Sequence, residues 1–301
     1  MAIINNDIKF LFYCKRLGVS FENLLTLGRL QYYGTAEHLK HQAEYFKGNT
    51  RGIDQIQFND GFAEPFFKIL GAASIDSIDY SDYQKATIIH DLNKPIAASL
   101  YNKFSCVLDS GTMEHIFNFP VAIENCMKAV KTGGHFIGIT PANNLMGHGF
   151  YQFSPELFFN VFSPANGFEI VKMIIAAGND QGEYNKWYEV INPATVGERV
   201  IIKNSFPTQL MFIAKKTKET AVFNTFPQQS DYVEAWARSS TGSSNENKAS
   251  GNNGLLKKVF YTLPLKFQQV ILAVNKELKN KPVATNDLGV INSRHFKELD
   301  V

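Results

Sequence analysis

The sequence predicts an α/β fold, built on a doubly wound, mostly parallel sheet with an antiparallel edge strand. Between residues 20 and 140, short apolar runs rich in β-branched side chains alternate with segments whose apolar residues recur at helical spacing. This alternation is typical of parallel strands joined by right-handed helical crossovers. Two later β-rich runs, 168–175 and 209–214, are separated by polar sequence. We expect these two runs to pair antiparallel at the edge of the sheet.

The first half of the chain supplies the elements of this sheet in order. We expect strands over the apolar runs 21–27, 74–79, 86–89, 104–108 and 135–139. Helical spacing predicts helices over 3–17, 35–47, 64–70 and 121–130. Gly71 follows the third helix at a position suited to a left-handed cap. Further on, Ser154-Pro155-Glu156 is a typical helix start, with a capping serine, a first-turn proline and an early acidic residue.

Four segments are expected along the chain. Residues 1–19 form an N-terminal helix, and 20–230 form the sheet domain. The stretch 231–254 is predicted to be a flexible linker, because it ends in a run of polar residues with almost no apolar side chain. Residues 255–301 are predicted to form an amphipathic helical tail. We expect this tail to pack on its own domain or on a sister subunit, in preference to a membrane surface.

The composition excludes several classes of protein. Thirty basic and 28 acidic residues leave a net charge of +2, which provides no electrostatic footprint for nucleic acid. No apolar run approaches the ~20 residues that a membrane span needs. At the N-terminus the basic residues follow the apolar stretch, the reverse of a signal peptide. Cys14, Cys106 and Cys126 are widely spaced and form no motif, which favours a reduced, cytoplasmic setting.

The stretch SCVLDSGTMEHIFNFPVAIENCMKAVKTGGHFIGITPANN (105–144) has a distinctive order of features. In sequence these are a strand ending in Asp109, the pair Glu114-His115, a helix, Lys131 and the turn Gly133-Gly134. The stretch resembles the central segment of class I S-adenosylmethionine-dependent methyltransferases of the ubiquinone-biosynthesis and related small-molecule type. Segments 74–93 and 147–169 are similar to other parts of that family, so the resemblance covers roughly two thirds of the chain. It implies a Rossmann-like domain whose site lies above the carboxyl ends of the parallel strands.

The glycine-rich turn of this family is reduced here. In the family, the first strand normally ends in three closely spaced glycines, which let the backbone approach the methionine part of the cofactor. The matching place contains only Gly28, which we assign to this contact, and Gly34. Asp79 follows Gly28 at more than twice the usual spacing of about 20 residues for the acidic residue of the second strand. This spacing indicates an insertion between the first and second strands.

The resemblance implies S-adenosylmethionine as the cofactor and assigns residues to its adenosyl group. Asp79, with Tyr80 beside it, would accept hydrogen bonds from the ribose hydroxyls; alternatively it is a solvated turn residue. Asp91 would accept from the adenine amino group while Leu92 covers the ring; alternatively Asp91 caps a helix.

Three neighbouring residues are candidates for the chemistry. Asp109 is expected beneath the cofactor sulfur, in contact with the cofactor, where it orients the nucleophile or the sulfonium. His115 is the candidate base because its proton affinity suits work near neutral pH, and Glu114 assists it. Alternatively, Glu114-His115 is a structural pair that ties the loop to the next helix. Related O-methyltransferases bind a metal around this turn, and Glu114-His115 match that site. A metal is therefore possible but is not predicted, because Gly111 stands where a further carboxylate would be needed.

The segment PANNLMGHGFYQFSPE, which follows the fifth strand, is dense in hydrogen-bonding groups and aromatic rings. We expect it to line a pocket for a polar, hydroxyl-rich acceptor, such as a sugar. The candidate substrate-binding residues are Asn143, Asn144, His148, Tyr151 and Gln152. Alternatively, these residues form a polar turn whose groups satisfy one another.

The leading hypothesis is an S-adenosylmethionine-dependent methyltransferase that acts on a hydroxyl of a small polar acceptor. The cofactor carries its own electrophile, so the protein mainly aligns a nucleophile and removes a proton. The reduced glycine turn leaves a second hypothesis open, a catalytically inactive binding or scaffold module whose C-terminal tail contacts a partner. A dehydrogenase using NAD(P) is disfavoured, because no G-x-G-x-x-G follows the first strand.

Overall fold

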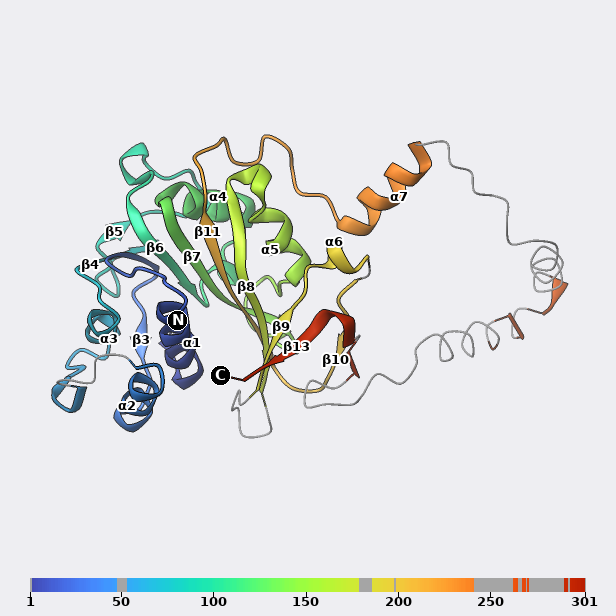
Figure 1. Ribbon diagram of the computed structural model, residues 1–301. Helices are drawn as coiled ribbons and strands as arrows, with labels where there is room; N and C mark the ends of the chain where they lie inside the picture. The colour runs from blue at the N-terminus through green and yellow to red at the C-terminus, as the bar shows by residue number, and fades with distance from the viewer. Residues whose placement is uncertain are drawn as a thin grey trace.

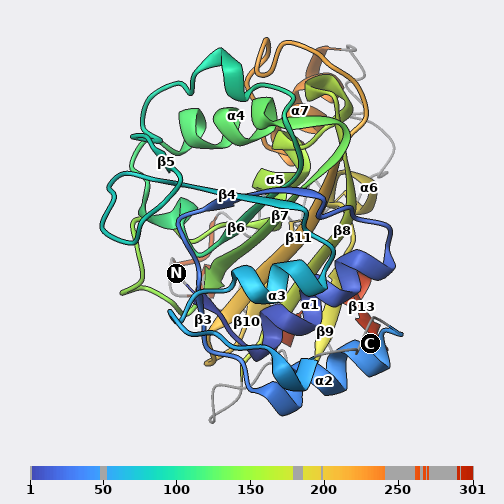
Figure 2. The same cartoon turned by 90° about the vertical axis from the view of Figure 1, so that its left-hand side faces the viewer.

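The computed structural model describes residues 2–47, 53–178, 186–197, 199–240, 262–264, 267–268, 270, 290–291 and 293–300. Within these residues a nine-stranded sheet has the order β13-β9-β8-β11-β7-β6-β2-β4-β5 (Figure 1). Helices lie on both faces of this sheet (Figure 2). The predicted α/β fold class is therefore confirmed.

The parallel half of the sheet contains the strands expected in the first half of the chain. They are β2 (Asn23–Leu27), β4 (Ser74–Asp79), β5 (Ile88–Ile89), β6 (Phe104–Ser110) and β7 (Val130–Asn143). β2 pairs in parallel with β4 on one side and with β6 on the other, so the strand order reverses beside β2. At such a reversal, the loops that leave neighbouring carboxyl ends diverge and form a crevice.

The antiparallel half begins at β11 (Thr208–Lys216), which lies between β7 and β8 (Phe168–Ala177) and is antiparallel to both. The predicted antiparallel pairing of these two β-rich runs is confirmed. Both strands lie inside the sheet, however, because β9 (Trp187–Val190) and β13 (Phe296–Leu299) extend it further. The antiparallel strand at this edge is β13.

Two short strand pairs lie outside the main sheet. β1 (Ala2–Ile3) pairs in parallel with β3 (Gln31–Tyr32), and β10 (Ile202–Lys203) pairs antiparallel with β12 (Val290–Ile291). The Ser110 hydroxyl, at the end of β6, donates to the backbone oxygen of Ala2 at 3.3 Å. The N-terminal segment therefore lies over the tip of β6, on the side of the sheet edge where the crevice is expected.

The helices form one layer on each side of the sheet (Figure 2). α4 (Phe119–Ala129) and α5 (Pro155–Val161) cover one face. The other face is covered by α1 (Asn5–Arg16), α2 (Ala36–Tyr45) and α3 (Glu64–Ile69). Shorter helical segments are α6 (Pro193–Val196), η1 (Ile53–Gln55), η2 (Ala98–Leu100), η3 (Met113–His115), η4 (Pro164–Asn166) and η5 (Ser293–His295). Among the described residues, no helix combines the length and apolar character that crossing a membrane requires.

Side chains on β11 alternate between the two layers. Leu210 and Phe212 pack in the core beneath α4 and α5, whereas Met211 and Ile213 pack in the core beneath α1 and α3. All four side chains are fully buried. Because both faces of the central strands are covered, these strands appear in the sequence as continuous apolar runs rather than alternating ones.

Two local predictions about chain turns are confirmed. Gly71, which follows α3, has a φ of 97°, in the left-handed region that favours glycine. The Ser154 side chain accepts the backbone N–H of Leu157 and caps the start of α5, with Pro155 in the first position.

Helix α1 is joined to the sheet by the buried side chain of Asn6. Its Nδ2 donates to Oε1 of Gln209 on β11 at 2.9 Å, and its Oδ1 accepts the indole N–H of Trp187 on β9 at 2.9 Å. Trp187 is 1% exposed, so Asn6 satisfies the single polar atom of a buried indole. The N-terminal helix is therefore part of the layer that packs on the sheet.

The C-terminal part of the chain is described only in segments. Residues 230–240 form α7 (Ser230–Ser240), whereas the sequence analysis placed 231–240 in a linker. Tyr232 and Trp236, one helical turn apart, stack with ring centroids 6.0 Å apart, which favours the helical form. The remainder of the predicted linker and most of the predicted tail lie outside the described residues. Within the tail, β13 is extended chain rather than helix.

Replacing Asn6 with Ala should lower the free energy of unfolding by about 1–3 kcal/mol, because the buried indole N–H of Trp187 loses its acceptor. Urea denaturation followed by tryptophan fluorescence measures this change. Asn5→Ala is a matched control, since Asn5 is exposed and its side chain accepts a single longer bond, from the Thr35 amide at 3.3 Å. Equal stability of Asn6→Ala and wild type would show that Asn6 does not hold α1 to the sheet.

Candidate functional site

A pocket of about 410 Å³ opens at the carboxyl ends of β4 and β5, beside η3. We call it the Asp79 pocket. Five residues that the sequence analysis assigned to the site line it, namely Asp79, Tyr80, Asp91, Leu92 and His115. They come from three separate stretches of the chain, so the sheet brings them together.

Asp79 is the last residue of β4 and is half-buried at the wall of this pocket. Its Oδ1 accepts the backbone N–H of Tyr80 at 2.7 Å. The backbone oxygen of Asp79 accepts the N–H of His90 at 2.8 Å, which ties the tip of β4 to the segment after β5. The Tyr80 ring is 74% exposed at the pocket mouth. The wall thus presents a carboxylate and an aromatic ring side by side.

Asp91 and Leu92 form another part of the same wall. Asp91 Oδ1 accepts the backbone N–H of Asn93 at 3.0 Å and its side-chain amide at 2.8 Å. These bonds from Asn93, together with the nearby Lys94 ammonium, lower the pKa of Asp91 below its ordinary value. Leu92 is 6% exposed and packs into the core on the α4 side. This wall therefore combines an ionised acceptor with an apolar surface.

Asp109 lies beneath the pocket rather than in it. Its side chain is fully buried, and its Oδ1 accepts the backbone N–H groups of Thr112 at 3.0 Å and Met113 at 3.3 Å. Burial, reinforced by the neighbouring Glu114 carboxylate, raises the pKa of Asp109 well above its usual range. The sequence analysis placed Asp109 in contact with the cofactor. In the structure it instead holds the turn that carries Glu114 and His115.

A second pocket, of about 390 Å³, lies on the other side of η3. We call it the Glu114 pocket. Its walls come from the N-terminal segment, α1, the tip of β6, β7, β11 and the loop after β7. The residues that line it are Ala2, Ile4, Asp7, Tyr33, Ser110, Gly111, Glu114, His115, Ile139, Thr140, Pro141, Leu145, His148 and Gln209. His115 lines both pockets and therefore stands at their border.

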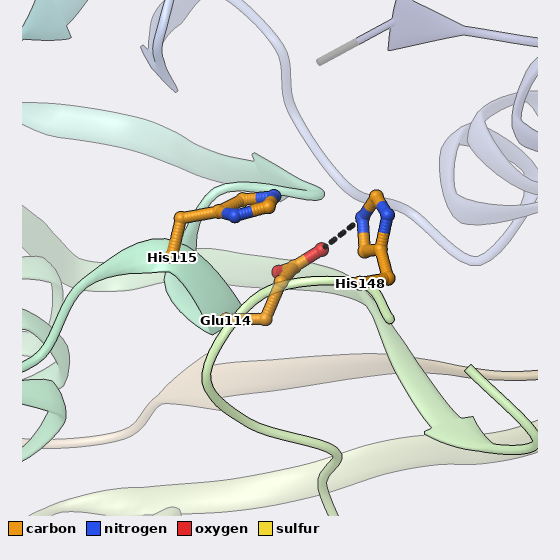
Figure 3. A group of neighbouring side chains, drawn as sticks. All are labelled: Glu114, His115 and His148. Atoms are coloured by element: carbon orange, nitrogen blue, oxygen red, sulfur yellow. Dashed lines mark ion pairs between the residues drawn. The ribbon is translucent and has the colours of Figure 1, made fainter. Parts of the chain in front are cut away.

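Glu114, His115 and His148 form a compact cluster at this border (Figure 3). Glu114 Oε1 lies 3.2 Å from His148 Nε2, a close contact that is an ion pair only when His148 is protonated and whose geometry does not make a hydrogen bond. The two imidazole ring centroids are 5.0 Å apart, with an angle of 66° between their planes. Glu114 is 1% exposed, whereas the His148 side chain is 53% exposed. A buried carboxylate is thus covered by two accessible imidazoles.

The environment shifts the proton affinities of this cluster in opposite directions. Burial raises the pKa of Glu114, and the contact with His148 offsets part of that rise. Burial lowers the pKa of His115 below its usual 6.5, and repulsion from His148 lowers it further. At neutral pH His115 is therefore a neutral imidazole, the form that accepts a proton or binds a cation.

The amides of Asn143 and Asn144 are used inside the protein. Asn143 Nδ2 donates to Asn204 Oδ1 at 3.1 Å, and Asn144 Nδ2 donates to the same oxygen at 2.6 Å. Asn144 has a φ of 58°, in the left-handed region that asparagine tolerates. Neither residue lines the two pockets described here. Their contacts match the alternative prediction of a self-satisfied polar turn.

Of the other predicted substrate-binding residues, His148 alone lines a pocket described here. The Tyr151 hydroxyl donates to the backbone oxygen of Phe117 at 2.6 Å. Gln152 Oε1 accepts the backbone N–H of Leu145 at 2.9 Å. Tyr151 and Gln152 therefore shape the loop that presents His148.

Gly28 ends β2 with a φ of 71° but lines neither pocket. Its N–H donates to the backbone oxygen of Ile78 on β4 at 2.8 Å. That amide is thus used within the sheet. After Gly28 the chain enters the short strand β3, and α2 begins only at Ala36. The reduced glycine turn is therefore followed by a short strand and not directly by a helix.

Asp7, which was not predicted as a site residue, lies on α1 in the wall of the Glu114 pocket. Asp7 is 2% exposed, and its Oδ2 accepts the backbone N–H of Ile4 at 3.1 Å. Its Oδ1 has no hydrogen-bond partner among the described residues. Burial raises the pKa of Asp7 to about 7. The available signal was an acidic residue between Ile4 and Ile8 on the apolar side of the predicted helix.

No protein-family model matches the chain, and no curated protein sequence matches it.

Comparison with solved structures finds S-adenosylmethionine-dependent methyltransferases among the similar folds. TehB from Haemophilus influenzae shares 11% identity over 70% of this chain, at a TM-score of 0.34, and this chain covers 62% of TehB. An S-adenosylmethionine-dependent methyltransferase from Thermotoga maritima, described as a possible histamine N-methyltransferase, shares 11% identity over 71% of this chain and 91% of its own, at a TM-score of 0.36. The 1,6-didemethyltoxoflavin-N1-methyltransferase of Burkholderia thailandensis, solved with S-adenosylhomocysteine, shares 9% identity over 70% of this chain and 78% of its own, at a TM-score of 0.36. At TM-scores below 0.5, this likeness assigns neither a family nor a function to the chain.

The raised pKa of Asp7 predicts a specific pH dependence of stability. A carboxyl whose folded pKa lies above its unfolded value stabilises the fold at low pH, and that contribution is lost as the pH rises through about 7. Asp7→Asn keeps an acceptor for the Ile4 amide and removes the titration. Between pH 5 and pH 8, the stability of wild type relative to Asp7→Asn should fall by on the order of 2–3 kcal/mol.

Urea denaturation at several pH values measures this difference. Asp82→Asn is the control, because Asp82 is exposed on a surface turn, and its stability should follow that of wild type at each pH. If the stability of wild type and of Asp7→Asn changed with pH in the same way, the raised pKa of Asp7 would be contradicted.

Proposed function

We propose that the protein is an S-adenosylmethionine-dependent methyltransferase that methylates a hydroxyl of a small polar molecule, such as a sugar. The adenosyl group would occupy the Asp79 pocket, and the acceptor would occupy the Glu114 pocket. One observation carries this proposal. The two pockets lie on either side of η3, at the carboxyl ends of strands next to the reversal of strand order, and His115 lines both.

The Asp79 pocket has the chemistry that an adenosyl group requires. The Asp79 carboxylate can accept hydrogen bonds from two ribose hydroxyls, and the ionised Asp91 can accept one from an exocyclic amine. Ile78, Leu92 and Ile116 supply apolar surface for a purine ring. The volume of about 410 Å³ falls within the range of small-molecule sites.

The border between the pockets has the chemistry that methyl transfer to a hydroxyl requires. When bound, S-adenosylmethionine supplies a methyl group on a positively charged sulfur, and the protein has to position the acceptor and remove its proton. His115 is neutral at neutral pH and lies between the pockets, so it can take that proton. Asp7 and Gln209 offer polar groups to hold the acceptor on the other side.

A second candidate function is a binding module without catalysis. The observation that favours it is Gly28, whose N–H is used by Ile78 and whose turn leads into β3 instead of a helix. No helix N-terminus directly follows the first strand, so the usual backbone contact to the methionine part of the cofactor is missing. Such a module would bind no S-adenosyl compound.

Titration with S-adenosylhomocysteine by calorimetry distinguishes these two functions. The wild-type protein should bind it, and Asp79→Ala should weaken binding by about 10- to 100-fold, because hydrogen bonds from the ribose hydroxyls to a carboxylate are lost.

Asp82→Ala is the matched control, since Asp82 is an exposed acidic residue three positions away that lines neither pocket. Its affinity should equal that of wild type. Absence of binding by a folded wild-type protein would select the non-catalytic module. Equal binding by wild type and Asp79→Ala would place the adenosyl group elsewhere.

A further inference from the structure

The cluster of Glu114, His115 and His148 has the composition of a metal site. Each residue offers one ligand atom, and the three atoms lie within 4.8 Å of one another. Glu114 and His115 come from η3, and His148 comes from the loop after β7. Figure 3 shows the carboxylate between the two imidazole rings. Three convergent ligands from two separate segments are what a catalytic zinc site uses.

Glu114 supplies an independent reason for a cation at this place. Its side chain is 1% exposed, and neither carboxylate oxygen has a hydrogen-bond donor among the described residues. The described residues that line its pocket include no lysine or arginine.

The backbone holds His148 over Glu114. The backbone oxygen of Glu114 accepts the N–H of Phe150 at 2.7 Å. Between these residues, Gly149 has a φ of 73°, and a Cβ there would lie 2.7 Å from the Glu114 backbone oxygen. Only glycine lets the chain pass this close to the Glu114 backbone. The turn that carries His148 is therefore held directly against Glu114.

We propose that Glu114, His115 and His148 bind a divalent first-row transition metal ion, with open coordination positions facing the Glu114 pocket. Around a zinc ion bound at about 2.0–2.1 Å, tetrahedral ligand atoms lie roughly 3.3 Å apart. Glu114 Oε1 and His148 Nε2 are 3.2 Å apart and already meet this spacing. The His115 side chain is exposed, and its rotation closes the remaining distance. Two imidazole nitrogens with one carboxylate favour zinc, iron or cobalt over magnesium and calcium, which prefer all-oxygen sites.

The role of this ion in catalysis rests on the proposed function, whereas its binding does not. In metal-free protein His115 takes the proton of the acceptor itself. With the ion bound, an acceptor hydroxyl in the Glu114 pocket can occupy an open position, where the positive charge lowers its pKa. The sequence analysis predicted no metal because Gly111 offers no ligand. His148, which is distant in sequence, replaces the missing carboxylate.

Calorimetric titration of untagged, chelator-treated full-length protein with Zn²⁺ tests the proposal, and Co²⁺ absorption reports the ligand geometry. We expect one Zn²⁺ per chain at micromolar affinity or tighter, and a cobalt spectrum of a four- or five-coordinate site. His148→Ala should weaken Zn²⁺ binding by more than about 100-fold, beyond the loss seen when an outer-sphere partner is removed. Glu114→Gln, which keeps the shape of the side chain, should weaken it to a similar degree.

His41→Ala is the matched control, because His41 is an exposed histidine on α2 outside the cluster, and its Zn²⁺ affinity should equal that of wild type. Circular dichroism establishes that each variant is folded, and His148 is exposed enough to be replaced without disturbing the core. Equal Zn²⁺ affinity in wild type and folded His148→Ala would overturn the proposal, as would millimolar Mg²⁺ displacing Zn²⁺ from wild type. S-adenosylhomocysteine binding is measured separately on metal-free protein, so the metal site and the methyltransferase assignment can each fail alone.

Discussion

The buried carboxylate of Asp109 is the interaction on which the site depends. It lies at the end of β6, next to the reversal of strand order, where the chain must leave the sheet. Its Oδ1 accepts the N–H groups of Thr112 and Met113 and so closes the first turn of η3. The Thr112 hydroxyl also donates to the backbone oxygen of Leu27 at 2.8 Å, which joins this turn to the end of β2. The position of Glu114 and His115 follows from these contacts, although Asp109 itself is fully buried and lines neither pocket.

The site is divided by this turn into two pockets of different origin. The Asp79 pocket is formed by the tips of β4 and β5, so it belongs to the parallel sheet. The Glu114 pocket needs segments from far apart in the chain, including Asp7 of the first helix, His148 after β7 and Gln209 on β11. Asn6 holds the first helix on the sheet, and the left-handed Gly149 lets the loop with His148 approach Glu114. Asn6 and Gly149, which line neither pocket, therefore determine where the pocket-lining groups lie.

Local patterns were sufficient to predict the parallel strands, their flanking helices and the caps at Gly71 and Ser154. These features depend on hydrophobic periodicity and on backbone preferences of single residues, both of which are visible in a sequence. The position of β8 inside the sheet was not predicted, because it depends on β9 and on β13, and β13 comes from the far end of the chain. Helix α7 was missed because its residues were assigned to the linker together with the polar run that follows them, although Tyr232, Val233 and Trp236 are apolar.

For the site, the sequence by itself determined which strand tips carry acidic residues, and it predicted that Asp79, Asp91 and Asp109 converge on one crevice. Asp79 and Asp91 line the Asp79 pocket, whereas Asp109 is buried beneath it. The sequence could not decide which polar side chains face that crevice, because the same amide or carboxylate can serve a turn or a ligand. Only the tertiary structure showed that Asn143, Asn144, Tyr151 and Gln152 are used within their own loop, and that His148 reaches Glu114. The physical reason is that each hydrogen-bonding group takes the nearest suitable partner, and distance in space is set by the packing of the whole sheet.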